Sequence, residues 1–380
     1  MPNFFNSSYS QAYSTSFKER VNLLLTPLKE KSKIITIIFF GKSTEDIYPA
    51  ELNEIKKAVD ISFRGKSPLI SYIIQPLRNR DEMAAEVTYL TETTSPESVD
   101  FKIFEDVRYL LYKQNNSTFL ITEGILGKSF YDSVNTQSTD IFYKIQSILA
   151  NEQLEIGDII RQWNYIGHIT ENEGGIQNYQ AFNDVRSQFY ETVKWNHGFP
   201  AATGIGMACR GVVVSLIALA VTMENKIISL DNPLQIPAFA YSESLLIGKQ
   251  SEITLKATPK FERANLVSSD GGVICFISGT AAIRGEMSMM EMNAGLQTNQ
   301  TIENILFLIS KRNLSRHGVE VENDMTVISL RVYIKNKADF DCVKSEVEKV
   351  WANLPVIYVE AGICRKELLI EIEGIAFANK

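Results

Sequence analysis

Histidine and cysteine are scarce in this chain of 380 residues, which contains three of the former and four of the latter. The cysteines lie far apart without a Cys-x-x-Cys pair, and the histidines form no His-Glu-x-x-His motif. Zinc sites are usually built from such closely spaced ligands, so we expect no metal site. The cysteine spacing does not require disulfides either, which favours a reduced, cytoplasmic location.

Excess basic charge and long apolar runs are also lacking. Acidic residues outnumber basic ones by 45 to 38, and no basic cluster stands out, so we expect no nucleic-acid partner. The longest apolar run, Val212 to Thr222, is too short for the roughly 20 residues of a membrane-spanning helix. Residues 1–17 lack the apolar segment of a signal peptide. We therefore expect no membrane partner.

The chain does contain a mixture of strand-like and helix-like segments. β-Branched runs predict buried strands at 33–41 and 212–221, whereas the glycines of 201–206 predict a tight turn. Apolar spacing predicts helices at 139–152 and 179–195. The last part of the chain is predicted to alternate strands (265–278, 324–334, 356–361, 369–376) with helices (297–312, 338–351). Two helices against a strand-rich sheet indicate an α+β fold.

The segment 364–376 carries the most informative combination of side chains. Glu371 and Glu373 lie on one face of a predicted strand with apolar neighbours, where a carboxylate is costly to bury without a partner or a purpose. Cys364 and Arg365 precede this strand by a short turn. A carboxylate, a cation and a thiol close together indicate a site for an anionic small molecule. Alternatively, Glu371 pairs with a lysine on a neighbouring strand and Cys364 is a small buried apolar residue.

Several short sequence motifs resemble those of the RidA/YjgF superfamily. They are Phe261-Glu-Arg-Ala264, Ile277-Ser-Gly-Thr280, Gln297-Thr298 leading into Asn304-Ile305, and Glu371-Ile-Glu-Gly-Ile-Ala376. Within that superfamily, four further motifs resemble one branch, the chorismatases, which include 3-hydroxybenzoate synthases. These motifs are at 161–166, 179–186, 200–206 and 278–283. The resemblance covers roughly residues 155–380, in the order in which the family has these motifs.

The resemblance implies a particular architecture. It would be an α+β fold with two RidA/YjgF (chorismate-mutase-like) halves, each a mixed sheet with helices packed on one face. Residues 1–155 would form a degenerate RidA-like N-terminal domain, and residues 156–380 a RidA-like C-terminal catalytic domain. Both a monomer and a homotrimer stay open. RidA proteins are trimers with sites between subunits, but a fused chain could make those contacts internally.

The resemblance also implies removal of the enolpyruvyl side chain of chorismate, with release of pyruvate and no cofactor. Protonating the methylene carbon of this enol ether creates an oxocarbenium ion, and Glu371 matches the family's proton donor. A buried carboxyl group with a raised pKa suits that role. Cys364 matches a cysteine of the members that make 3-hydroxybenzoate, where it would steer the ring chemistry.

Binding would depend on cations, because chorismate carries two carboxylates and guanidinium groups bind carboxylates well. Arg263 and Arg161 are the expected anchors. Arg161 could instead stack on Trp163, and Arg263 could be a salt-bridge residue at a sheet edge. The other expected substrate-binding residues are Tyr241, Thr203, Gly204, Arg284 and Arg365.

Three other functions stay open. They are hydrolysis of chorismate to a dihydroxycyclohexadiene carboxylate, imine deamination of the RidA type, and binding of an aromatic acid without catalysis. The chain also departs from the family at one turn. The family usually has Ile-Val-Gly-His there, whereas this chain has Ile283-Arg284-Gly285-Glu286, which changes the charge near the expected pocket.

Overall fold

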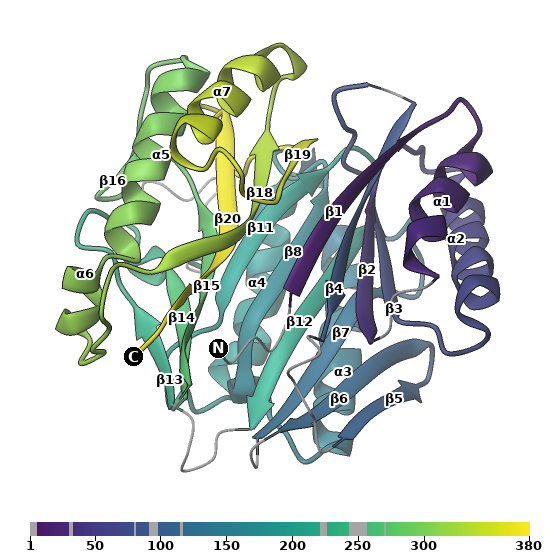
Figure 1. Cartoon of the computed structure of the whole chain (residues 1–380), viewed down its shortest axis with the longest axis horizontal. Helices are drawn as coiled ribbons and strands as arrows, with labels where there is room; N and C mark the ends of the chain where they lie inside the picture. Colours follow the sequence, from purple (N-terminus) through teal and green to yellow (C-terminus); the bar gives the residue numbers. More distant parts are fainter. Residues whose placement is uncertain are drawn as a thin grey trace.

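The main sheets are built from three successive parts of the chain. The computed structural model describes residues 6–29, 33–79, 81–90, 98–114, 117–220, 226–242, 257–269 and 271–380. We call the three parts unit 1 (6–89), unit 2 (98–220) and unit 3 (226–378). The sheets lie in the middle of the molecule, with α1 and α2 on one side and α5 and α7 on the other (Figure 1).

Unit 1 is a four-stranded sheet with the order β1-β4-β2-β3. Its elements are β1 (Asn6–Tyr13), α1 (Phe17–Leu25), β2 (Ile34–Phe40), α2 (Tyr48–Phe63), β3 (Leu69–Ile73) and β4 (Glu82–Tyr89). β2 confirms the strand predicted at 33–41. β1 lies within residues 1–17, for which no strand is predicted, and it pairs along its whole length with β4. Its backbone pairing, rather than apolar side chains, makes this polar segment a strand.

Unit 2 is a six-stranded sheet with the order β11-β8-β12-β7-β6-β5. Its elements are β5 (Ser98–Phe104), β6 (Val107–Gln114), β7 (Ser117–Leu126), α3 (Val134–Asn151), β8 (Ile159–Gly167), β9 (Asn172–Glu173), β10 (Ile176–Gln177), α4 (Asn178–Glu191), β11 (Ala201–Met207) and β12 (Val212–Ala220). The turn predicted at 201–206 is wrong, because β11 occupies it. Its glycines allow close approach instead, since a Cβ on Gly204 would lie 2.8 Å from the ring of Tyr179.

Unit 3 is a six-stranded sheet with the order β13-β14-β15-β20-β18-β19. Its elements are β13 (Lys226–Leu230), β14 (Ala264–Ser269), β15 (Gly272–Thr280), β16 (Ile283–Arg284), β17 (Met287–Ser288), α5 (Ala294–Leu308), α6 (Lys311–Arg316), β18 (Thr326–Ile334), α7 (Phe340–Val350), β19 (Val356–Glu360) and β20 (Ile370–Ala378). The strands and helices predicted for this part of the chain are confirmed, with the strand region at 265–278 divided into β14 and β15.

The three units share one strand order. In units 2 and 3 the last strand, β12 or β20, lies between the third strand and the strand that follows the first long helix. The pairs β8/β11 and β18/β19 are parallel, as is β2/β3 in unit 1, which has the same order without the first two strands. The α+β fold of mixed sheets with helices on one face is therefore confirmed, and a third, shorter unit is added. The unit 2 sheet contains strands from both sides of residue 155, so the sheets do not divide at the boundary predicted there.

A shared core joins the three units. Buried side chains of all three sheets, among them Phe39, Tyr165 and Tyr333, belong to one apolar cluster. Two further clusters fill the space between the unit 2 sheet and its helices α3 and α4, and between the unit 3 sheet and α5 and α7. Burying one such large side chain stabilises the fold by about 1.5–3 kcal/mol, so the core fixes the units against one another.

Two features of the described residues bear on partners. None of the helices in this part of the chain combines the length and the apolar character that a membrane span requires. No group of three or more His, Cys, Asp or Glu side chains among these residues is placed to hold a metal ion.

Candidate active site

A narrow cavity of about 70 Å³ lies between units 2 and 3. Unit 2 contributes side chains from α4 and β11, and unit 3 contributes side chains from β15, from the segment before β20 and from β20 itself. The expected site residues that line it are Glu371, Cys364, Arg263, Arg365, Tyr241 and Gly204. The fold therefore brings together residues that are up to 167 positions apart in the sequence.

Arg263 provides a buried cation at this cavity. One of its terminal nitrogens donates hydrogen bonds to the carbonyl oxygen of Ile236 (2.6 Å) and to the hydroxyl of Tyr241 (2.7 Å). Its Nε is buried and has no hydrogen-bond partner among the described residues. A buried donor without a partner is costly, and a ligand carboxylate can satisfy it.

Arg365 provides a second cation. Its NH1 donates to the carbonyl oxygen of Glu286 (2.8 Å) and to the hydroxyl of Ser288 (3.0 Å), which fixes its direction. Its Cζ lies 5.0 Å from the centre of the Tyr241 ring, and the Cζ of Arg263 lies 5.7 Å from the same centre. Tyr241 thus holds two guanidinium groups beside one cavity.

Glu371 is the acid of this cavity. Its side chain is buried and accepts no hydrogen bond from the described residues. Burial, and secondly the negative charge of Glu373, raise the pKa of Glu371 to about 8, although Arg161 and Arg263 act in the opposite direction. A side chain at position 279 would collide with Oε1 of Glu371, so Gly279 makes room for this carboxyl group. The group is therefore protonated at neutral pH.

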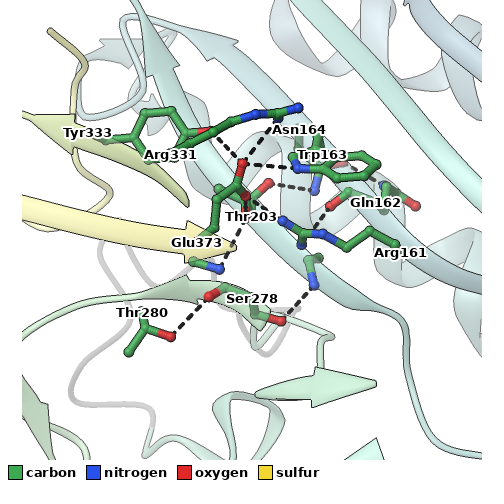
Figure 2. A network of polar contacts seen from close by, with 12 residues as sticks. Arg161, Gln162, Trp163, Asn164, Thr203, Ser278, Thr280, Arg331, Tyr333 and Glu373 are labelled. Carbon is green, nitrogen blue, oxygen red and sulfur yellow. Dashed lines mark hydrogen bonds and ion pairs between the residues drawn. The ribbon is translucent and has the colours of Figure 1, made fainter. Parts of the chain in front are cut away.

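Glu373, two residues further along β20, lies in the opposite environment (Figure 2). Its carboxylate accepts hydrogen bonds from five side chains, namely Arg161, Thr203, Trp163, Arg331 and Tyr333. Burial alone would raise its pKa, but the two arginines and the hydroxyl donors outweigh burial and hold the pKa of Glu373 below its usual value. Glu373 is thus a charged, structural carboxylate.

Arg331 extends this network into unit 1. It binds both carboxylate oxygens of Glu86, at 2.6 and 2.9 Å, and donates to the hydroxyl of Tyr165 at 2.8 Å. The two buried arginines and two buried glutamates balance in charge where the three units meet. This balance lets Glu373 stay ionised while its neighbour Glu371 is neutral.

Three expected binding residues do not line the cavity. The guanidinium group of Arg161 is paired with Glu373 and lies 4.5 Å from the centre of the Trp163 ring, so the stacking alternative describes it. Thr203 accepts the backbone N–H of Gly279 (3.1 Å) and donates to Glu373. Arg161 and Thr203 thus hold Glu373, the neighbour of Glu371 on β20, rather than a ligand.

Arg284 is the third. It forms an ion pair with Glu303 at 2.6 Å and a hydrogen bond with Asn304, both on α5. Its charge is therefore satisfied away from the cavity.

Cys364 lines the cavity, as expected. Burial, and secondly the neighbouring Glu371, raise the pKa of its thiol to about 12. The thiol is therefore neutral at pH 7. A nucleophilic cysteine has the opposite property, a pKa lowered by nearby cations.

Helix α4 supplies residues for which the sequence predicts no role. Tyr179, Gln180 and Asn183 line the cavity opposite Glu371 and Arg263. The only signal for them was that they lie in the family-like motif at 179–186. Burial raises the pKa of the Tyr179 hydroxyl, which therefore stays protonated.

Comparison with known proteins agrees with this geometry. Residues 102–218 match the family model described as "Chorismatase FkbO/Hyg5-like, N-terminal". A 3-hydroxybenzoate synthase of Streptomyces hygroscopicus is 30% identical over 232 residues, which are 59% of this chain and 65% of that protein. Over these residues the chain is similar to the chorismatases.

Two further matches extend this relationship. A chorismatase of Streptomyces hygroscopicus is 28% identical over 221 residues, 57% of this chain and 61% of that protein. The matched region is thus somewhat less than two thirds of either relative's length. A chorismatase crystal structure has a TM-score of 0.71 at 20% identity, covering 97% of this chain and 98% of that one, so the fold is the chorismatase fold. The family match spans most of unit 2.

Proposed function

We propose that this protein converts chorismate to 3-hydroxybenzoate and pyruvate. One observation carries the proposal: a carboxyl group with a pKa of about 8 lines a cavity that also holds two guanidinium groups. A neutral acid near two cations suits an acid-labile, dianionic substrate. The names of its relatives support the same reaction.

Glu371 donates its proton to the methylene carbon of the enol ether. The bond between the ring carbon and the ether oxygen then breaks, and its electron pair leaves on what becomes the ketone oxygen of pyruvate. The oxygen of the neighbouring ring hydroxyl bonds to the carbon that has lost the ether, and the proton of that hydroxyl restores the acid. The resulting arene oxide opens by breaking the bond between this oxygen and its original ring carbon. The carbon that now bears the oxygen loses its hydrogen as a proton and the oxygen gains a proton, which gives an aromatic ring with the hydroxyl at position 3. The two products together contain the atoms of chorismate, so no cofactor, oxidant or water is consumed.

Arg263 and Arg365 anchor the two carboxylates of the substrate. The free Nε of Arg263 and the remaining N–H groups of Arg365 are available for charge-assisted hydrogen bonds. A cavity of about 70 Å³ is narrow for chorismate, so the lining side chains move apart when it binds.

Cys364 favours the aromatic product over the hydrolytic one. Its neutral thiol stands beside Glu371 in the cavity and takes space that an attacking water would need. Hydrolysis to a dihydroxycyclohexadiene carboxylate would consume one water, whereas aromatisation consumes none.

We also place the enzyme in the cytoplasm and expect a monomer. The four cysteines are unpaired, which suits a reducing compartment. Both walls of the cavity come from one chain, so the site needs no second subunit.

The test is to incubate the purified protein with chorismate and identify the products by mass and absorption. We expect 3-hydroxybenzoate and pyruvate in equal amounts. A diene product with equal pyruvate would contradict the aromatic outcome, and saturable chorismate binding without pyruvate would contradict catalysis.

A further inference from the structure

A second, larger cleft lies between units 1 and 2. It has a volume of about 450 Å³ and is lined by α2 and β3 of unit 1 and by β6 and β7 of unit 2. These elements are the counterparts of α4, β11, β14 and β15, which form the candidate active site. The cleft therefore occupies the equivalent position at the preceding junction of the chain.

Strand registers define the correspondence residue by residue. Both β7 and β15 contain one extra residue relative to the strand that each pairs with. In unit 2, Leu216 pairs with Thr122 and Val214 pairs with Ile125. In unit 3, Gly374 pairs with Ile277 and Ile372 pairs with Thr280. Thr122 thus corresponds to Ile277. On the next strand Thr122 pairs with Tyr109, and Ile277 pairs with Ala264. The residues just before these two are Arg108 and Arg263, so Arg108 corresponds to the arginine of the active-site cavity.

Arg108 also resembles Arg263 in its surroundings. Its Nε is buried and has no hydrogen-bond partner in the described part of the chain, as is true of Arg263. Its Cζ lies 5.0 Å from the centre of the Phe101 ring, as that of Arg263 lies 5.6 Å from the Phe261 ring. Arg108 as a whole is half-buried, unlike the buried Arg263, but its buried Nε is an unused donor, which points to an anion.

The rest of the lining favours an organic anion. Lys56 and Lys57 are exposed on α2, and neither forms an ion pair with another described residue. Tyr48 and Tyr72 also line the cleft with ring centres 5.7 Å apart, and both side chains are almost fully buried. The lining thus combines free positive charge with two closely packed aromatic rings.

Of the three acidic residues that line the cleft, Asp60 keeps its charge, and the charges of Asp106 and Glu123 are offset. Asp106 is bound to Lys144 at 2.8 Å, and Asp60 accepts a hydrogen bond from Ser67. Glu123 is half-buried and accepts hydrogen bonds from Ser215 (2.7 Å) and Ser71 (3.3 Å). Burial raises the pKa of Glu123 to about 7, so this carboxyl group is partly protonated at neutral pH and repels an anion less.

The cleft lacks the equivalent of the proton donor. Glu371 pairs with Tyr333, and the corresponding pair in unit 2 is Val213 with Tyr165. A valine therefore occupies the position of the acid. At the third junction, between units 3 and 1, the described residues of unit 1 begin with β1 and hold no counterpart of Arg108 or Arg263. Among the described residues, an anchored site thus forms at two of the three junctions, and only the junction between units 2 and 3 has an acid at the position of Glu371.

We propose that the cleft between units 1 and 2 is a second binding site, which holds a small aromatic carboxylate on Arg108, Lys56 and Lys57 without converting it. The ligand's carboxylate binds the guanidinium group, and its ring lies against the two tyrosines. The protein therefore binds two such anions, one at each anchored junction.

Titration of the full-length protein with benzoate tests this proposal. We expect two bound benzoates in the unaltered protein and one in Arg108→Met, because losing a buried charge-assisted contact weakens binding by about tenfold or more. Arg263→Met should keep the cleft site and lose the other. Arg312→Met, which removes an exposed arginine of α6, should keep both.

Two further measurements keep the test decisive. The Lys56→Ala/Lys57→Ala double variant changes only exposed residues, so it should fold, and we expect it to bind the cleft benzoate several-fold more weakly. A crystal soaked in benzoate should show the ligand against Arg108. A single bound benzoate that Arg263→Met removes and the lysine variant leaves unchanged would overturn the proposal, whatever the outcome with chorismate.

Discussion

Glu371 and Glu373 lie two residues apart on β20 in opposite electrostatic environments. Glu373 accepts hydrogen bonds from five side chains and is ionised, whereas Glu371 has no hydrogen-bond partner among the described residues and has its pKa raised to about 8. Pairs of carboxyl groups whose surroundings separate their pKa values divide acid and structural roles between them. Here the structural carboxylate also helps to keep the acid protonated.

Replacing the acid should abolish catalysis. Glu371→Gln keeps the size of the side chain and its neutral state but cannot donate a proton to carbon, so we expect pyruvate formation to fall by about 10²–10⁴-fold. Pyruvate release is followed with a coupled assay. The control Glu320→Gln changes an exposed glutamate and should keep full activity. Near-normal activity of Glu371→Gln would exclude this carboxyl group as the proton donor.

Activity should depend on pH through the same group. Because Glu371 must be protonated to act, and its folded-state pKa is about 8, kcat/KM should be constant below that value and fall tenfold per pH unit above it. The measurement is a pH–rate profile at constant ionic strength. A fall in kcat/KM with a midpoint near pH 4.5, the ordinary pKa of a glutamate, would contradict the assignment.

Removing the thiol should change the product rather than the release of pyruvate. In Cys364→Ala the cavity gains room for water beside Glu371, so we expect pyruvate to form while the share of 3-hydroxybenzoate falls and a diene acid appears. Chromatography with absorbance detection separates these products. Cys342→Ala, which alters an exposed cysteine of α7, is the matched control. An unchanged product ratio in Cys364→Ala would remove the role of this residue.

Glu373→Gln should destabilise the protein. The substitution leaves Arg161 without its carboxylate partner in a buried site and removes one of the two carboxylates of Arg331. Breaking a buried ion pair from one side lowers the free energy of unfolding by about 3–5 kcal/mol. Urea denaturation of the variant measures the loss. A change below 1 kcal/mol, on the order of an exposed pair, would show that the network is not structural.

Parts of this molecule could be predicted from sequence because local patterns determine them. The β-branched runs of β2 and β12 and the alternation around Glu371 identify strands without knowledge of their neighbours. α1, α2 and β1 carry weaker patterns. For β11 the local pattern of glycines predicts a turn. Gly204 instead allows close contact with Tyr179, and a contact between distant residues cannot be predicted from local sequence.

The site residues likewise fall into those that the sequence predicts and those that it does not. Glu371 and Arg263 lie in family-like motifs, Cys364 shortly precedes the last of these motifs, and all three residues line the cavity. Arg161 looked like a substrate anchor, but its partner is 212 residues away on another unit, and only the folded chain shows that pairing. The residues of α4 were missed because their role depends on how units 2 and 3 meet.

The central claim is that Glu371 carries a proton at neutral pH inside the cavity. Infrared difference spectra between the unaltered protein and Glu371→Gln, recorded from pH 5 to pH 10, measure this proton directly through the C=O stretch of the protonated carboxyl group. We predict one protonated carboxyl group that disappears with a midpoint near pH 8, as its pKa of about 8 requires. A carboxyl group that is already ionised at pH 6 would contradict the account.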